Sequence, residues 1–195
     1  MHIIFGGSRG IGKAIAKKFI FHNRNVLVIS RTKPSALNCE HFKYDFSARN
    51  QELPKIKEIE SIVFCQKNRD SMENDEEINF SVLSILNILR ELKENFLKNS
   101  LILLMGSGAS EFIVDEQPAL YHISKGSIIQ LTKYLSIKLG NLGVRANCII
   151  PGTVLKDENK DFYINNKELQ EMYKKLIPRG EIVSSEEIAE VAFFF

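Results

Sequence analysis

The sequence predicts an α/β fold with three layers, in which helices cover both faces of a doubly wound parallel sheet. Two observations lead to this prediction. Short apolar runs rich in β-branched residues alternate with longer segments whose apolar residues recur at helical spacing. The runs are also apolar almost throughout, as strands buried on both faces must be. Such alternation is typical of parallel strands joined by right-handed crossover helices.

Six strands and three long helical segments are expected in order along the chain. The strands are expected at 2–5, 25–30, 41–45, 61–65, 100–105 and 144–150, and the helices at 11–22, 76–97 and 119–139. Only a loop fits between Arg31 and Asp45, so the helix that would normally join the second strand to the third is expected to be lost. A last helix begins at Ser185 and still continues at Phe195, which predicts that the terminal strand of the sheet is missing.

Length and composition limit the possible classes of protein. The chain has 195 residues, 44% of them hydrophobic and 26% charged, with a net charge of +2. This is ordinary for one domain spanning 1–195, and it gives no support for binding to nucleic acid or a membrane surface. The beginning of the chain lacks the apolar run of a secretory leader. The three cysteines lack metal-ligand spacing, so no metal site is expected. Cys65 and Cys148 are predicted to be buried, reduced thiols of a cytoplasmic protein.

A glycine-rich stretch, GGSRGIG at 6–12, follows the first strand and opens the first helix. Glycines at this junction permit a tight turn and let the backbone approach a pyrophosphate closely. The helix N-terminus then faces the negative charge of the phosphates. The stretch therefore predicts nucleotide binding.

The spacing Gly6-x-x-x-Gly10-x-Gly12 resembles the compact single-domain branch of the short-chain dehydrogenase/reductase family. That branch carries Thr-Gly-x-x-x-Gly-x-Gly, and only Phe5 departs from it here. The resemblance implies a Rossmann-like NAD(P)-binding domain. It also implies cofactor contacts at Gly6, Ser8, Arg9, Gly10, Ile11 and Gly12.

The end of the second strand predicts which cofactor is preferred. It carries Ser30, Arg31 and Thr32, and it lacks the acidic residue that would accept a ribose 2′-hydroxyl. Guanidinium groups suit phosphate, and Arg9 lies in the glycine turn on the same side. Both arginines match basic positions of NADP-preferring members of the family, with Arg31 and Thr32 as cofactor contacts. NADP is thus predicted over NAD. The alternative is that both arginines face solvent.

Four residues predict an active site. Tyr121 and Lys125 lie four apart in a helix that begins after Pro118, so they share one face. The neighbouring ammonium is expected to lower the pKa of the phenol. Ser107 follows the strand at 100–105, and Asn79 lies early in the helix at 76–97. These resemble the catalytic Tyr-x-x-x-Lys, serine and asparagine of the family, in which the asparagine holds a water for proton relay.

Further parts of the chain resemble the same family. Pro151, Gly152 and Val154 match the turn that borders the nicotinamide, and Asp45 matches the aspartate that contacts adenine. FCQK at 64–67 departs from the family's Asn-Asn-Ala-Gly, so the glycine that lets the adenine ribose approach the backbone is missing. Lys67 would compensate for this loss if it lay near the phosphates. Lys156 stands where a threonine is expected.

The resemblance implies an NADP-dependent oxidoreductase that transfers a hydride between the cofactor and a carbonyl or secondary alcohol of a small substrate. The alternative is a non-catalytic nucleotide-binding sensor or scaffold, which the altered FCQK turn favours. The loop at 153–175 is strongly charged. These charges mildly favour a polar or phosphorylated substrate, unless they face solvent and only Phe162, Tyr163, Leu169 and Tyr173 point inward.

Self-association is also expected. The helix at 76–97 is apolar on several sides, so one side can pack on the sheet and another on a symmetric partner. In the family this helix and the tyrosine-bearing helix form a dimer. A homodimer or higher homo-oligomer is therefore predicted.

Overall fold

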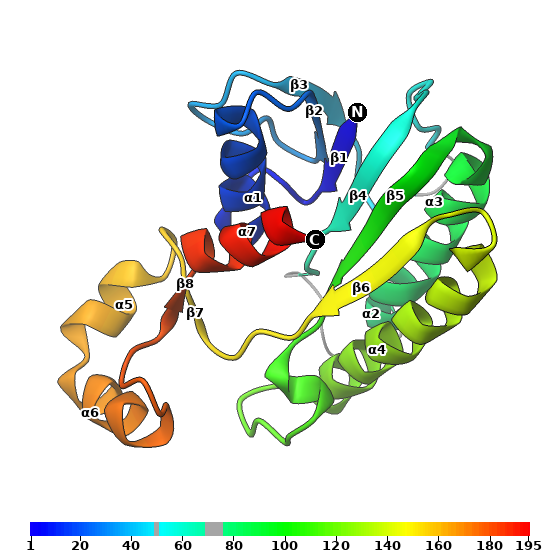
Figure 1. The fold of residues 1–195 in the computed structure, drawn as a ribbon. Helices are drawn as coiled ribbons and strands as arrows, with labels where there is room; N and C mark the ends of the chain where they lie inside the picture. The colour runs from blue at the N-terminus through cyan, green and yellow to red at the C-terminus, as the bar shows by residue number, and fades with distance from the viewer. Residues whose placement is uncertain (49–50, 69–75) are drawn as a thin grey trace.

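A computed structural model describes residues 1–48, 51–68 and 76–195 (Figure 1). Six parallel strands form one sheet in the order β3-β2-β1-β4-β5-β6. Their bounds are β1 (His2–Phe5), β2 (Val26–Ser30), β3 (Glu40–Lys43), β4 (Ile59–Phe64), β5 (Phe96–Met105) and β6 (Arg145–Ile149). The predicted doubly wound parallel sheet is confirmed. Within the described residues the sheet ends at β6, so no further strand follows it.

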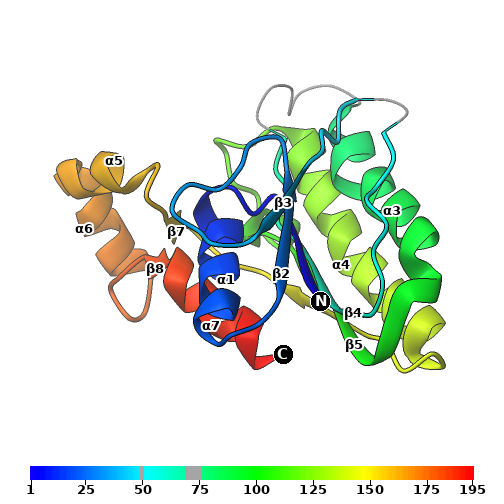
Figure 2. The same ribbon diagram turned by 90° about the horizontal axis from the view of Figure 1, so that it is seen from above.

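Helices cover both faces of the sheet, as Figure 2 shows. One face carries α1 (Gly10–Phe21) and α7 (Ser185–Phe194), and the other carries α3 (Ser84–Leu92) and α4 (Ala119–Gly140). Alternate side chains of β1 point to opposite faces, so Ile3 and Phe5 pack under α3 and α4 while Ile4 packs under α1 and α7. All three side chains are fully buried.

The helix predicted at 76–97 is a composite of different helical types. It consists of α2 (Glu76–Ile78), a π-helical turn (Asn79–Leu83), α3, and a 3₁₀ turn (Lys93–Asn95). Phe96 and Leu97 belong to β5, so the predicted helix extends two residues too far. Their apolar side chains continue the helical pattern of α3, but the backbone is already paired with β4 at Ile59.

The connection between β2 and β3 contains no helix, as predicted. The last helix begins at Ser185, also as predicted, and Ser184 caps it: the Ser184 hydroxyl accepts a hydrogen bond from the Glu187 amide at 3.2 Å, while the Glu187 carboxylate accepts from the Ser184 amide at 2.8 Å. Ile188 and Ala192 are buried in the core, whereas Val191 is 44% exposed.

The remaining elements form a small projection beside the main sheet. It comprises the short pair β7 (Val154–Leu155) and β8 (Val183–Ser184), with α5 (Lys160–Asn165) and α6 (Lys167–Leu176) between them. Figure 1 shows α5 and α6 standing away from the sheet. This projection contains most of the strongly charged loop at 153–175.

Two further sequence predictions concern the cysteines and membrane association. Cys65 and Cys148 are half-buried rather than buried; Cys65 lines the cavity just after β4, and Cys148 lies within β6. Across the described ranges, no helix combines the length and apolarity that crossing a bilayer requires.

Candidate active site

A single cavity of about 1020 Å³ lies at the carboxyl ends of the strands, where ligands bind in open parallel sheets. It is lined by the turn after β1, by the ends of β2, β4 and β5, and by the segment after β6. It brings together every predicted site residue except Asn79. These residues are Gly6, Ser8, Arg9, Gly10, Ile11, Gly12, Arg31, Thr32, Asp45, Ser107, Tyr121, Lys125, Pro151, Gly152 and Val154.

The turn between β1 and α1 requires glycine on steric grounds. Gly6 has φ +75°, and a Cβ there would lie 2.6 Å from the Gln66 backbone nitrogen. A Cβ on Gly12 would lie 2.4 Å from the Gly6 carbonyl oxygen. Among the described residues no side chain caps α1, whose N-cap is Arg9. The first-turn amides can therefore bind an anion, as a pyrophosphate site demands.

The end of β2 presents hydroxyl and guanidinium groups. The Ser30 hydroxyl is engaged locally, since it donates a hydrogen bond to the Thr32 carbonyl oxygen at 2.9 Å. Arg9 and Arg31 are both exposed and line the same cavity. A phosphate bound at this end would face two positive charges.

The altered FCQK turn still fits a dinucleotide. The Gln66 backbone makes the close approach to Gly6, although the family's glycine is missing. Within the described residues, the buried Oε1 of Gln66 has no hydrogen-bond partner. It lines the cavity as an acceptor that a ribose hydroxyl would satisfy. Asp45 lines the same end, where its Oδ1 accepts from the Ser47 amide at 3.0 Å.

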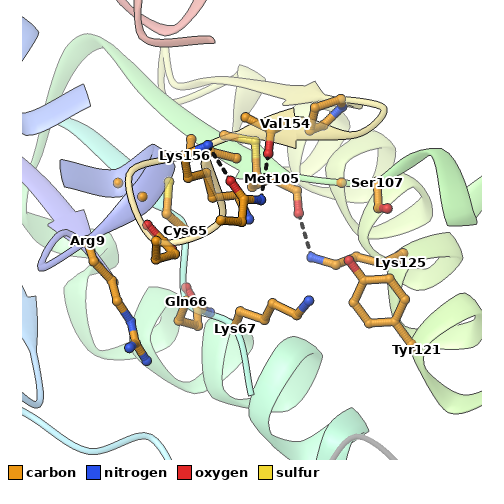
Figure 3. Close-up of a pocket in the computed structure, with 18 of the residues that line it drawn as sticks. Arg9, Cys65, Gln66, Lys67, Met105, Ser107, Tyr121, Lys125, Val154 and Lys156 are labelled. Carbon is orange, nitrogen blue, oxygen red and sulfur yellow. Dashed lines mark hydrogen bonds between the residues drawn. The ribbon is translucent and has the colours of Figure 1, made fainter. Parts of the chain in front are cut away.

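Lys125 lies at the other end of the cavity, on the inner face of α4. Its ammonium donates a hydrogen bond to the Met105 carbonyl oxygen at 2.9 Å, as Figure 3 shows. The side chain is 8% exposed. Burial lowers the pKa of Lys125 to about 8; the Glu77 carboxylate opposes this change, and the Lys67 ammonium adds to it.

Tyr121 is also buried, and its pKa is raised. Burial is the main cause, a hydrogen bond with Ser107 opposes it, and the negative charge of Glu77 adds to it. The expectation that Lys125 lowers this pKa is therefore wrong for this structure, because the ammonium is directed at Met105. The phenol is protonated at neutral pH and is an acid rather than a base.

Ser107 and the start of α4 are held by local hydrogen bonds. Ser107 caps a short 3₁₀ turn, and its hydroxyl accepts from the Ala109 amide at 3.3 Å. One ring nitrogen of His122 accepts from the Val114 amide at 2.9 Å, and the other lies 3.0 Å from the Pro118 carbonyl oxygen. These contacts fix the loop that precedes Tyr121.

Two predicted positions differ from expectation. Asn79 is exposed and does not line the cavity, so its water-holding role stays a prediction. The buried polar residues of that segment are Glu77 and Ser81, neither of which was predicted from the sequence. Lys67 does not lie beside the phosphate-binding turn: its ammonium is 5.1 Å from the Tyr121 ring centroid, and Figure 3 shows it pointing toward Lys125.

The charged loop contributes both polar and aromatic groups to the cavity. Tyr163 lines it, whereas Phe162 is 61% exposed. The Thr153 hydroxyl lies 3.1 Å from the Tyr173 hydroxyl, which joins the turn after β6 to α6. Lys156 and Glu158 pack against Gly10, so part of the loop's charge faces the cavity.

Comparisons with known proteins agree with this geometry. The family model described as enoyl-(acyl carrier protein) reductase matches residues 65–195. Oxidoreductase UcpA of Salmonella typhimurium is 24% identical over 98% of this chain and 85% of its own length. L-rhamnose 1-dehydrogenase (NADP(+)) of Thermoplasma acidophilum is 24% identical over 98% of this chain and 87% of its own.

A solved structure is similar over nearly the whole fold. It is a short chain dehydrogenase family protein of Francisella tularensis, with a TM-score of 0.79 and 26% sequence identity. The match covers 99% of this chain and 89% of that one. The similarity therefore extends over nearly the whole α/β fold.

Proposed function

The chain belongs to the short-chain dehydrogenase/reductase family of oxidoreductases, and we propose that it transfers a hydride between NADP and the carbonyl or secondary alcohol of a small substrate. One observation carries this proposal. A single cavity joins the glycine turn and Arg31 at one end to Tyr121, Lys125 and Ser107 at the other. A dinucleotide bound along it would bring its nicotinamide to the proton donor.

The roles follow from the chemistry of each group. The bound nicotinamide supplies or accepts the hydride. In the reducing direction the protonated phenol of Tyr121 donates its proton to the substrate oxygen. The Ser107 hydroxyl donates a hydrogen bond to the same oxygen as negative charge develops there. The Lys125 ammonium, which donates to the Met105 carbonyl oxygen beside the cavity, would hold the nicotinamide ribose.

The preference for NADP is supported by charge. Arg9 and Arg31 reach the cavity where the second strand ends, and that strand end carries no carboxylate. Forked guanidinium bonds to a 2′-phosphate are short and charge-assisted. One similar protein, L-rhamnose 1-dehydrogenase (NADP(+)), carries this cofactor in its name.

The proposed activity is tested with purified protein in two steps. NADPH is added first, and binding is followed by the change in its fluorescence. A panel of small ketones is then added, and oxidation of NADPH is followed by absorbance at pH 7. A nucleotide-binding sensor would give the fluorescence change without oxidation by any ketone, which would contradict the proposal.

We also propose that the chain forms a homodimer through the outer side of α4 and the neighbouring α3. The outer side of α4 exposes Ile123, Tyr134 and Ile137 to 55%, 54% and 77%. Burying such side chains against a two-fold-related copy is favourable. Light scattering at micromolar concentration should give twice the chain mass, and Ile137→Lys should give the monomer mass. A monomeric wild-type protein would contradict the proposal.

A further inference from the structure

Glu77 is a buried carboxylate beneath the Tyr121–Lys125 pair. Its residue exposure is 1%, although it lies in a short helical segment at the edge of the domain. Its Oε1 accepts two hydrogen bonds, from the Ser81 hydroxyl at 2.6 Å and from the Ser124 hydroxyl at 3.0 Å. The carboxylate is thus fixed both to its own segment and to α4.

Ser124 links this carboxylate directly to the reacting pair. It is fully buried and lies between Tyr121 and Lys125 in sequence. Its hydroxyl also lies 2.9 Å from the Tyr121 carbonyl oxygen. Movement of Glu77 would therefore disturb the turn of α4 that carries both reacting side chains.

Hydrogen bonds alone do not account for the burial of Glu77. Its second oxygen, Oε2, is buried, and the described ranges of the chain offer it no hydrogen-bond partner. An ionised carboxylate in such a place is costly unless a positive charge lies nearby. Lys125 is the buried cation of the same region, and its electrostatic interaction with Glu77 favours the charged form of the lysine.

Other titratable groups also act on the ammonium of Lys125. Lys67, just after β4, disfavours its positive charge, and burial does so more strongly. Cys65, at the end of β4, and Cys148, in β6, favour the positive charge but are the smallest influences. The pKa values of both thiols are themselves raised by burial, so they are neutral at pH 7. Glu77 is therefore the principal anion that counteracts the lowering of the Lys125 pKa by burial.

We propose that Glu77 is a positioning residue of the Tyr121–Lys125 pair, which fixes the pair through Ser124 and keeps Lys125 positively charged at neutral pH. The proposal rests on the assignment of Tyr121 and Lys125 to the proposed function. Glu77 touches no reacting atom. It acts by supplying a negative charge that favours the protonated form of the buried ammonium.

The test follows the protonation of Lys125 itself. Lysine labelled with ¹³C at Cε is incorporated into the whole chain, and the Lys125 signal is identified by its loss in Lys125→Met. The titration midpoint of the wild type is expected at about 8. Glu77→Gln keeps the shape and one oxygen acceptor but removes the charge, so the midpoint should fall by about one pH unit or more.

Ser81→Ala is the matched control. It removes one of the two hydrogen bonds to Oε1 and leaves the carboxylate charge, so the Lys125 midpoint should stay at its wild-type value. Equal midpoints in the wild type and Glu77→Gln would overturn the proposal. So would an equal fall in Ser81→Ala, because the effect would then be structural.

A second measurement needs no variant of Glu77. The Lys125 midpoint of the wild-type chain should lie above pH 7, and a midpoint below pH 7 would overturn the proposal. Both measurements are made without cofactor or substrate. If the midpoints are as expected but the protein never oxidises NADPH, the proposed function is contradicted and the role of Glu77 is not.

Discussion

The Lys67 ammonium nitrogen lies 5.1 Å from the centroid of the Tyr121 ring, although Lys67 follows β4 and Tyr121 lies in α4. The Lys125 ammonium lies 5.7 Å from the same centroid. Two cations thus approach one phenol ring, and each disfavours the charge of the other. Since the family carries glycine where this chain has Lys67, the second cation is a departure of this chain.

Removing Lys67 should make Lys125 harder to deprotonate. The positive charge of Lys67 contributes to the lowered pKa of Lys125. In Lys67→Met the Lys125 pKa should therefore rise above about 8, in the direction opposite to Glu77→Gln. The ¹³C titration measures this change. Lys133→Met, an exposed position on the outer side of α4, should leave the midpoint unchanged. A fall in Lys67→Met would contradict the electrostatic account.

Tyr121→Phe should abolish turnover while preserving cofactor binding. The substitution keeps the buried ring and removes only the proton-donating hydroxyl. A positioned general acid contributes about 10²–10⁴-fold to the rate, so kcat should fall by that factor. NADPH affinity, measured by fluorescence titration, should match that of the wild type. Turnover close to wild type on a verified substrate would exclude Tyr121 as the acid.

Arg31→Ala should weaken NADPH much more than NADH. A charged hydrogen bond to the 2′-phosphate contributes about 1.5–3 kcal/mol, which corresponds to roughly a ten- to hundredfold increase in Kd. Fluorescence titration with each cofactor measures the two losses. Arg24→Ala, an exposed arginine outside the cavity, is the control. Equal losses for NADPH and NADH in Arg31→Ala would refute the phosphate assignment.

Two glycine substitutions should change stability in opposite directions. A Cβ on Gly12 would meet the Gly6 carbonyl oxygen at 2.4 Å, so Gly12→Ala should destabilise the protein by about 1–3 kcal/mol or more. Gly126 lies inside α4 with open space where a Cβ would point. Gly126→Ala should stabilise the protein by about 0.5–1 kcal/mol. Urea unfolding gives both values, and destabilisation by Gly126→Ala would show an unrecognised contact.

The buried Lys125 should make stability depend on alkaline pH. Its pKa falls from 10.5 to about 8 on folding. Between these values the unfolded chain holds a proton that the folded protein lacks, so the free energy of unfolding rises with pH across that window. The contribution is roughly 3 kcal/mol at most. Lys125→Met should lack this rise when the two proteins are unfolded in urea at pH 7.5 and 10.5. Parallel curves would show that Lys125 titrates as it does in the unfolded chain.

Much of this architecture could be predicted from sequence, because strand, glycine turn and helix start each leave local patterns. Strand β1, the turn from Gly6 to Gly12 and the capped start of α7 are determined by neighbouring residues. The position of Lys67 could not be predicted in this way, because a long side chain leaving a strand end can reach either end of the cavity. Its direction depends on the packing of α4 against β5, which only the assembled fold determines.

The segment around Asn79 illustrates a second limit. Helical periodicity assumes a constant rotation per residue, and the π-helical turn breaks that assumption. Periodicity therefore predicted a regular helix that is apolar on several sides, and Asn79 was expected at the site only from the family resemblance. In the structure the polar residues Glu77 and Ser81 are buried and Asn79 is exposed. Ile85, Ile88 and Leu89 share one buried face of α3.

The π-helical turn at Asn79–Leu83 also makes the position of Glu77 depend on the number of residues in this segment. A π-turn accommodates a surplus residue within an otherwise α-helical path. Deleting a single residue there would let the α-helical path run on unbroken, and each α-helical residue turns through about 100°. Glu77 would then rotate away from Ser124, while α3 would still pack against the sheet. The position of the Glu77 carboxylate beside the Tyr121–Lys125 pair thus depends on one extra residue in this turn. A chain that lacks this residue would keep the same sheet and helices but would lose the contact between Glu77 and Ser124.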